Sequence, residues 1–217
     1  MQRRERAQAS ALHPRAELRS AGLPDWRLLA IGGALVVGLA IVAAVLLFSS
    51  GPNSNSGVQQ PDDGGLHVAA GTTCRLPEAP CGPDPYSTIP AASGPHWDPS
   101  GVANWGVYAS PQNESQLVHN LEHGGIVIWY DPAQVDTTGV QRLADYVDQQ
   151  VASGISGRFK FILSPWDAAE PLPAPVVATA WRWMLQLQAA DTAAIDEFAR
   201  THYQMSPEPN GGPAPPS

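Results

Sequence analysis

Residues 112–130 read QNESQLVHNLEHGGIVIWY, a helix signal followed at once by a strand signal. Gln112–His123 predicts a helix, with Ser110 as its cap and Pro111 in the first turn, where the N–H that proline lacks would be unpaired anyway. Gly124-Gly125 ends this helix, because a chain that leaves a helix commonly needs a residue with positive φ. The five apolar residues Ile126–Tyr130 then predict a buried strand.

Helix and strand signals continue to alternate beyond this stretch. Expected strands are Val102–Tyr108 and Phe159–Leu163, and expected helices are the amphipathic segment Asp136–Ala152 and a last helix capped by Asp191. The segment Val176–Leu187 is ambiguous and reads as a strand followed by a helix. This order predicts an α+β (or α/β) fold class with helices packed on a mixed β-sheet, and a thioredoxin-like or a ferredoxin-like arrangement fits it.

A candidate membrane anchor precedes this domain. Leu28–Phe48 is 21 residues without a charge, and as a helix it spans about 31 Å, close to the roughly 30 Å hydrocarbon core of a bilayer. A cleaved signal peptide is the alternative, but its apolar region is only about 7–15 residues long. Six arginines lie before the span, so the sequence predicts a single-pass plasma-membrane protein with a cytoplasmic N-terminus and its C-terminal domain outside.

Composition divides the chain into five segments. They are an Arg-rich cytoplasmic leader (1–27), a transmembrane helix (28–48), a flexible linker (49–65), an extracytoplasmic α+β domain (66–206) and a disordered Pro/Gly tail (207–217). The linker and the tail are too polar to bury surface. Within the anchor, Ala30, Ala34 and Gly38 have the four-residue spacing of helix pairing, although so alanine-rich a span produces such spacings by composition alone.

The charge balance excludes one class of partner. Outside the leader, the remaining 190 residues carry 6 basic and 17 acidic side chains. So acidic a surface argues against binding to a phosphate backbone, and no nucleic-acid partner is expected. No sequence feature indicates an organic cofactor, and none identifies a protein partner.

Cys74 and Cys81 are the only two cysteines. Both lie on the side of the anchor where the compartment is oxidising, which favours a disulfide that closes a small loop. A thiol metal site or a redox pair is the alternative. The six-residue gap does not fit the C-x-x-C redox motif, so the structural disulfide is the preferred interpretation.

His119 and His123 are four residues apart, which places both imidazoles on one face of the predicted helix. That face lies away from the apolar stripe of Leu117 and Leu121, as expected for two ligands of one metal. The string His119–His123 also matches the H-x-x-E-H pattern of inverted zinc peptidases, in which the glutamate, here Glu122, activates a zinc-bound water. Those enzymes take a third, usually acidic, zinc ligand from further along the chain, and no second short motif stands out there. A domain of about 140 residues is also small for their fold, so the sequence favours a binding protein over an enzyme.

Three strings carry a family resemblance: SGPH at 93–96, WGVY at 105–108 and LVHNLEHGGIVIWYD at 117–131. They resemble a bacterial family known as a domain of unknown function, number 3105, over roughly residues 66–208. Its S-G-P-H motif corresponds to His96, and its H-x-L-E-H-G-G motif corresponds to the segment from His119 to Gly125. The resemblance implies one membrane anchor and an exported domain, and it implies no activity.

His96, His119 and His123 are the predicted metal ligands. His67, Glu122, His202 and Met205 are additional candidates, with Glu122 orienting a histidine from outside the ligand set. His202 fits a buried core position as well, but with Met205 it would add a soft thioether that suits copper, which is placed ahead of zinc. The leading hypothesis is therefore a membrane-anchored metal-binding protein that handles or senses a metal. A metal-free cell-envelope interaction module and a zinc hydrolase are the alternatives.

Overall fold

The computed structural model describes residues 54–76, 79–153 and 157–215. All of them belong to the second of the two units into which the chain divides, residues 51–217. The predicted leader and the predicted span 28–48 lie outside the described residues. Among the residues that are described, no helix has both the length and the apolar character needed to cross a membrane.

The main sheet has six strands, in the order β1-β8-β7-β5-β6-β4. Their bounds are Val58–Gln59 (β1), Gly106–Val107 (β4), Ile126–Tyr130 (β5), Phe161–Pro165 (β6), Val176–Ala180 (β7) and Trp183–Leu187 (β8). β6 is parallel to both β5 and β4, whereas β7 is antiparallel to β5 and β8, and β1 is antiparallel to β8. The sheet is therefore mixed, as the sequence predicts.

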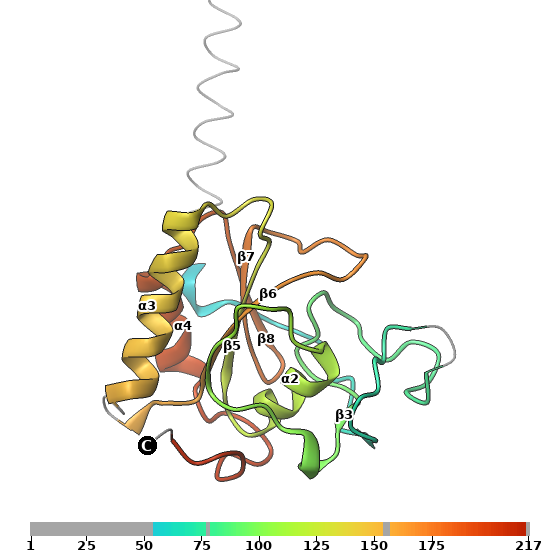
Figure 1. The fold of residues 1–217 in the computed structure, drawn as a ribbon. Coiled ribbons are helices and arrows are strands. Elements are labelled where there is room, and N and C mark those ends of the chain that lie inside the picture. The colour runs from blue at the N-terminus through green and yellow to red at the C-terminus, as the bar shows by residue number, and fades with distance from the viewer. Residues whose placement is uncertain (1–53, 77–78, 154–156, 216–217) are drawn as a thin grey trace, which may run out of the picture. The chain divides into compact units, whose positions relative to one another are not determined.

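Three α-helices cover the sheet in the described part of the chain, namely α2 (Glu114–Glu122), α3 (Thr137–Ser153) and α4 (Thr192–His202). Figure 1 shows α3 and α4 beside one another on one side of the sheet and α2 on the other side. Short 3-10 turns, Ser54–Ser56 (η1) and Pro99–Gly101 (η2), complete the helical elements. This arrangement confirms the predicted α+β class with helices packed on a mixed sheet.

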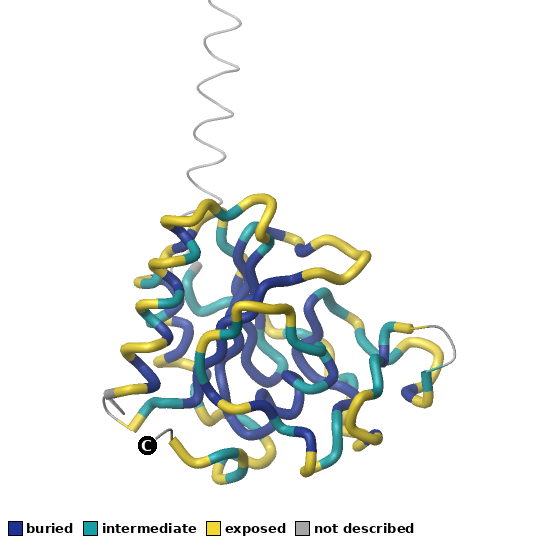
Figure 2. The backbone as a smooth tube through the Cα atoms, viewed as in Figure 1, coloured by how far each residue is buried: buried dark blue, intermediate teal, exposed yellow. Residues whose placement is uncertain are grey.

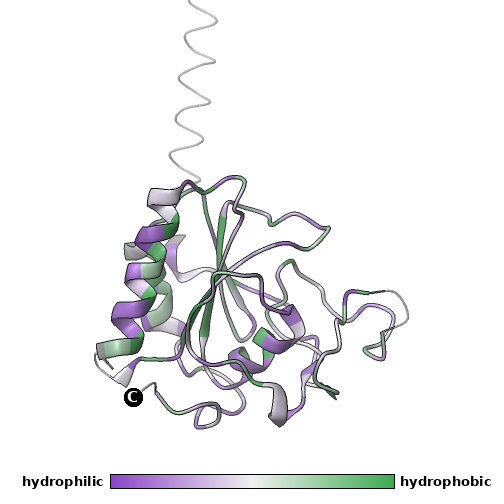
Figure 3. Ribbon diagram, in the orientation of Figure 1, coloured by the Kyte–Doolittle hydropathy of each residue, from purple (hydrophilic) through white to green (hydrophobic). Residues whose placement is uncertain are grey.

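The core lies where the central strands meet the helices. Every residue of β5, β6 and β7 is buried, and Figure 2 shows these strands as the dark centre of the domain. Trp129, Phe161 and Phe198 are the largest fully buried side chains. The hydrophobic stripe of α3, which includes Leu143 and Val147, faces the sheet (Figure 3), because apolar residues at helical spacing share one face.

The N-terminal cap predicted from the sequence is correct for one helix and wrong for another. α4 is capped by Asp191, as predicted, since its Oδ1 accepts hydrogen bonds from the N–H groups of Ala193 (3.1 Å) and Ala194 (3.0 Å). α2 starts later than predicted, because Asn113 rather than Ser110 is its cap. Asn113 Oδ1 accepts from Ser115 N at 2.9 Å, which leaves Pro111 before the helix.

Two predicted segments differ from the structure for identifiable reasons. In the segment Val102–Tyr108, only Gly106–Val107 pairs in the sheet. The backbone of Ala103 instead forms hydrogen bonds with the side chain of Asn120, which accepts from the N–H at 3.1 Å and donates to the carbonyl at 2.8 Å. The ambiguous segment Val176–Leu187 is an antiparallel strand pair with no helix, and its turn contains Arg182 at φ 63°.

The predicted linker and tail also differ from the structure where they are described. Val58–Gln59 pairs with β8, and Gln60 N donates to Arg182 O at 2.8 Å. At the other end, Lys160 Nζ donates to the carbonyls of Pro209 (2.7 Å) and Gly211 (2.9 Å). Both segments are polar, but hydrogen bonds to their backbone groups hold them on the domain, an interaction that hydropathy does not reveal.

Lys160 is the only lysine in the chain, and its substitution tests the docking of the tail. Its buried ammonium donates to three carbonyls, those of His123, Pro209 and Gly211. We expect Lys160→Met to remove these charge-assisted bonds, to lower the free energy of unfolding by about 1–3 kcal/mol and to speed hydrogen exchange in residues 207–215. Exchange measured by mass spectrometry checks this, with exposed Arg200→Met as the control. Unchanged exchange in the tail would contradict it.

Candidate metal centre

A separate two-stranded sheet carries two of the histidines. β2 (His67–Val68) and β3 (His96–Trp97) are parallel, and His67 lies opposite His96 in the register. Backbone bonds from His96 N to Leu66 O (2.9 Å) and from Asp98 N to Val68 O (2.8 Å) hold the pair. Because residues at one register position point to the same face of a sheet, the two imidazoles lie together, with ring centroids 4.7 Å apart.

The other members of the cluster come from the last turn of α2. His119, Glu122 and His123 have the i, i+3, i+4 spacing that shares one helical face. That face is buried and packs against the β2–β3 sheet. The ring of His119 lies 5.6 Å from that of His67, 5.1 Å from that of His96 and 4.6 Å from that of His123, between centroids. The structure thus brings together His67, His96, His119, Glu122 and His123.

Within this cluster, three side chains can converge on one ion. Ligand atoms of His67, His119 and Glu122 all lie within 4.8 Å of one another. Ligands of a tetrahedral ion are roughly 3.3 Å apart at the usual bond lengths, and His67 Nε2 is already 3.5 Å from Glu122 Oε2. His67 and Glu122, predicted as additional candidates, therefore lie with His119 in the candidate ligand set.

His96 supports Glu122 instead of joining that set. Its ring is fully buried, with Nδ1 2.8 Å from the carbonyl oxygen of Gly94 and Nε2 3.0 Å from Glu122 Oε2. A carboxylate accepts hydrogen bonds, so in the contact with Glu122 the donor is the Nε2–H group of His96. His96 then holds the Glu122 carboxylate in place by a charge-assisted hydrogen bond.

His119 has the properties of a candidate metal ligand. Its side chain is buried, and Nδ1 has no hydrogen-bond partner. Burial, reinforced by the neighbouring charges of His123 and His96, lowers the pKa of His119 to about 4. The imidazole is therefore neutral at physiological pH, which is the form that binds a cation. An unpartnered buried nitrogen normally costs free energy, and a bound metal would satisfy it.

The electrostatics of Glu122 favour its charged form. Burial alone would raise the pKa of this carboxyl, but the hydrogen bond to His96 and the charges of His96 and His67 outweigh burial and hold the pKa below its usual value. A carboxylate next to a neutral imidazole is a suitable donor pair for a divalent cation.

His123 occupies the far side of the cluster, under the C-terminal segment. Its Nδ1 lies 3.2 Å from Glu208 O and 3.8 Å from the Glu208 carboxylate, and Gly211 packs against the ring. The H-x-x-E-H mechanism requires both histidines on the metal and the glutamate free to act as a base. Here Glu122 contacts His67 and His96, so the arrangement differs from that of the inverted zinc peptidases.

His202 and Met205 lie outside the cluster. His202 Nε2 is 2.6 Å from the carbonyl oxygen of Ser56, and the ring stacks on Trp183 at 4.2 Å between centroids. Met205 is exposed. The set of His202 and Met205 with the other histidines, which the sequence suggested for copper, is therefore not assembled.

Cys74 and Cys81 form the predicted disulfide, with an S–S distance of 2.01 Å. A pocket of about 600 Å³ lies on another part of the domain, at the N-terminal end of α2, lined by residues that include Arg75, Glu114 and Trp166. Its charged groups pair with one another, since Arg75 Nε donates to Glu114 Oε2 at 2.6 Å. This pocket does not open at the histidine cluster.

These observations define an α+β domain with a buried histidine–glutamate cluster between a helix and a small parallel sheet. The chain belongs to the family described as "Protein of unknown function (DUF3105)", which matches residues 80–214. The match includes His96, His119, Glu122 and His123 and begins after His67 and Cys74. No curated protein and no solved structure matches the chain.

The lowered pKa of the buried His119 imidazole can be tested by titration of the metal-free protein. Its folded-state pKa of about 4 lies below the unfolded value, so the associated stability is complete above about pH 6.5 and is lost as the pH falls towards 4, by ~3 kcal/mol at most. NMR should give a His119 midpoint near 4, and His119→Gln should flatten the stability profile between these pH values. A midpoint near 6.5 would contradict a lowered pKa.

Proposed function

We propose that this chain is a membrane-anchored extracytoplasmic protein whose domain binds a divalent transition metal through His67, His119 and Glu122. The observation that carries the proposal is the convergence of these three side chains within 4.8 Å, around a buried His119 nitrogen that has no other partner. His96 would position the Glu122 carboxylate in that site, since it contacts the carboxylate and no other candidate ligand by hydrogen bond.

Two imidazoles and one carboxylate are donors of intermediate hardness. They suit Cu²⁺ and Zn²⁺, and copper(II) ranks ahead of zinc in intrinsic affinity for nitrogen and oxygen donors. Copper(I) would need thioether or thiolate ligands, and Met205 does not approach the cluster. The proposal is therefore copper(II) or zinc, with copper ahead.

Exposure of one ligand supports a role in metal handling or sensing. The His67 side chain is 42% exposed, whereas the Glu122 side chain is only 7% exposed. A site with three protein ligands leaves a coordination position for water or for a group from a partner. Metal would enter and leave at His67, so the site suits exchange better than permanent storage.

The proposed location rests on the sequence and on the disulfide. The uncharged segment Leu28–Phe48 follows a leader that contains six arginines, and by the positive-inside rule this order supports a location of the domain outside the membrane. A Cys74–Cys81 disulfide is typical of an oxidising compartment.

We also propose a thioredoxin-like topology for the sheet. Supporting it, β5 and β6 are parallel neighbours around α3, the antiparallel pair β7–β8 adds beside β5, and α4 follows. A ferredoxin-like arrangement needs two β-α-β units, and the second is missing here because β7 follows β6 through a loop. No cysteine lies between β5 and α3, so the proposal concerns topology and includes no thiol redox activity.

Metal binding is tested by titrating the purified full chain with Cu²⁺ and Zn²⁺ and by elemental analysis after washing. We expect about one ion per chain. His119→Ala and Glu122→Gln should weaken binding by more than 100-fold, and His96→Gln by roughly 10–100-fold, because it removes only the support of a ligand.

Glu170→Gln, which alters an exposed carboxylate far from the histidines, is the matched control and should bind as the natural chain does. A folded natural chain that retains neither metal would overturn the proposal and favour a metal-free interaction module. Equal binding by the Glu122→Gln variant would remove Glu122 from the ligand set.

Location is tested separately from metal binding. In cells that express the full chain, we expect it to stay in the membrane pellet after alkaline carbonate extraction, and a C-terminal reporter that is active only outside the cytoplasm to give signal. Leu35→Asp with Leu39→Asp should release the chain from the membrane pellet or block its membrane insertion, because each charge in the span costs about 2.5–3.5 kcal/mol on insertion. Complete extraction of the natural chain would contradict the anchor.

A further inference from the structure

The candidate metal centre is built from two parts that are attached to the domain in different ways. His119 and Glu122 lie on α2, whose Leu117 and Leu121 are fully buried in the main core. His67 lies on the two-residue strand β2, outside the main sheet. The position of His67, and with it the third ligand, depends on whatever holds the β2–β3 sheet against α2.

The disulfide provides the packing beneath that small sheet. A second apolar cluster, separate from the main core, consists of buried Val68, Cys74 and Cys81, and Trp97 packs against it. Because side chains alternate along a strand, His67 and His96 face α2 while Val68 and Trp97 face the disulfide. Two of the three buried members of this cluster are the bridged cysteines, and the partly buried Ala79 and Tyr86 also pack against it, so the disulfide lies among the apolar side chains that support β2 and β3.

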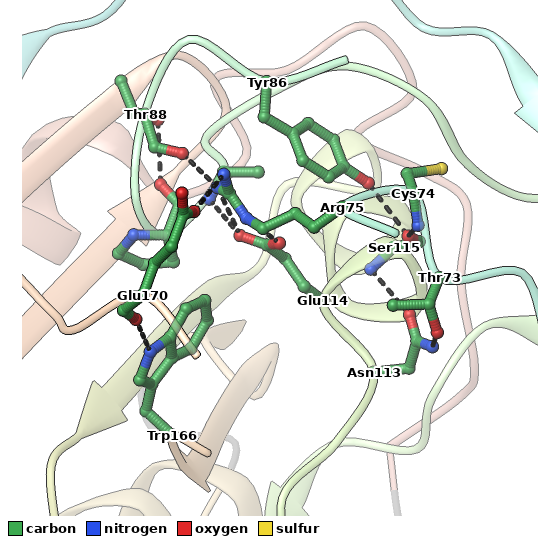
Figure 4. A network of polar contacts seen from close by, with 12 residues as sticks. Thr73, Cys74, Arg75, Tyr86, Thr88, Asn113, Glu114, Ser115, Trp166 and Glu170 are labelled. Carbon is green, nitrogen blue, oxygen red and sulfur yellow. Dashed lines mark hydrogen bonds and ion pairs between the residues drawn. The ribbon is translucent and has the colours of Figure 1, made fainter. Parts of the chain in front are cut away.

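The residues Thr73, Cys74 and Arg75, here called the cystine segment, also bind the first turn of α2 (Figure 4). Cys74 N donates to Ser115 Oγ at 3.1 Å, and Asn113 Nδ2 donates to Thr73 Oγ1 at 2.8 Å. Arg75 forms an ion pair with Glu114. Burial raises the pKa of the Glu114 carboxyl, and the opposing hydrogen bond from Arg75 only partly offsets this rise. The cystine segment therefore contacts the strand that carries His67 and the helix that carries His119 and Glu122.

We propose that the Cys74–Cys81 disulfide controls completion of the metal centre: only the oxidised chain holds His67 in reach of His119 and Glu122. The inference rests on the proposed function and adds its regulation. Two thiols lose two electrons and two protons to form the S–S bond, and a disulfide-class oxidant takes up both and becomes two thiols.

The control acts when the protein matures and not as a reversible switch in the folded domain. Cys74 is 2% and Cys81 5% exposed, so the bond is shielded from thiols once the domain has folded. A chain that has not been oxidised binds metal through α2 alone and binds it weakly. Full affinity then arises only in an oxidising compartment, which prevents loading on the cytoplasmic side.

Zinc titration of the full chain with Cys74→Ala and Cys81→Ala together is the test. Alanine is preferred to chemical reduction, because free thiols bind zinc themselves. We expect at least 10-fold weaker binding, with unchanged hydrogen-exchange protection in Ile126–Tyr130. Leu76→Ala, an exposed position between the two cysteines, is the matched control and should bind zinc within twofold of the natural chain.

A double-mutant cycle with His67→Ala separates a specific effect from general loosening. If the disulfide acts by placing His67, removal of the disulfide changes zinc affinity less than twofold in the His67→Ala background. A 10-fold loss that persists in that background overturns the inference, as does equal affinity with and without the disulfide. If the cysteine variant fails to fold, Val68→Ala, which trims the same cluster, takes its place in the cycle. A natural chain that binds neither Zn²⁺ nor Cu²⁺ overturns the proposed function and this inference together, and if the natural chain binds Cu²⁺ alone, the same cycle is measured with Cu²⁺.

Discussion

A buried carboxylate is the constraint on which the rest of this site depends. The Glu122 side chain is only 7% exposed, and an isolated charge at that depth is strongly unfavourable unless hydrogen-bond donors or cations surround it. The fold supplies His96 on one side, with its second ring nitrogen fixed by Gly94, and His67 on the other. The small β2–β3 sheet is therefore the means by which a carboxylate at the end of α2 becomes tolerable in the interior.

Segments that are distant in sequence complete both ends of α2. At its first turn, the cystine segment bonds to Asn113, Glu114 and Ser115. At its last turn, the C-terminal segment passes over His123, and Glu208 N donates to Glu122 O at 3.1 Å. A helix of nine residues is marginal by itself. Its position, and the position of every group it carries, is set by these tertiary contacts.

Sequence reasoning reached the elements whose signals are local. Ile126–Tyr130, the cap at Asp191, the disulfide and the grouping of His96 with His119 and His123 were all predicted, because they depend on runs, caps and short motifs. The place of His67 was not predictable, because it results from parallel pairing with a strand 29 residues away, and no spacing rule links the two. The packing of the linker and tail also escaped prediction, since their backbone hydrogen bonds leave no trace in hydropathy.

The composition of the cluster itself favours a cation. Four neighbouring imidazoles, two of which contact the Glu122 carboxylate, cannot all be protonated, because like charges at ring-centroid distances of 4.6–5.6 Å repel one another in a medium of low polarity. His119 consequently stays neutral and keeps an unpartnered nitrogen in the interior. A further proton on one of the other imidazoles would add positive charge to the cluster, but it would leave this nitrogen without a partner. A divalent ion between His119, His67 and Glu122 would satisfy the nitrogen and neutralise the carboxylate at once, so protons and metal compete for one set of donors.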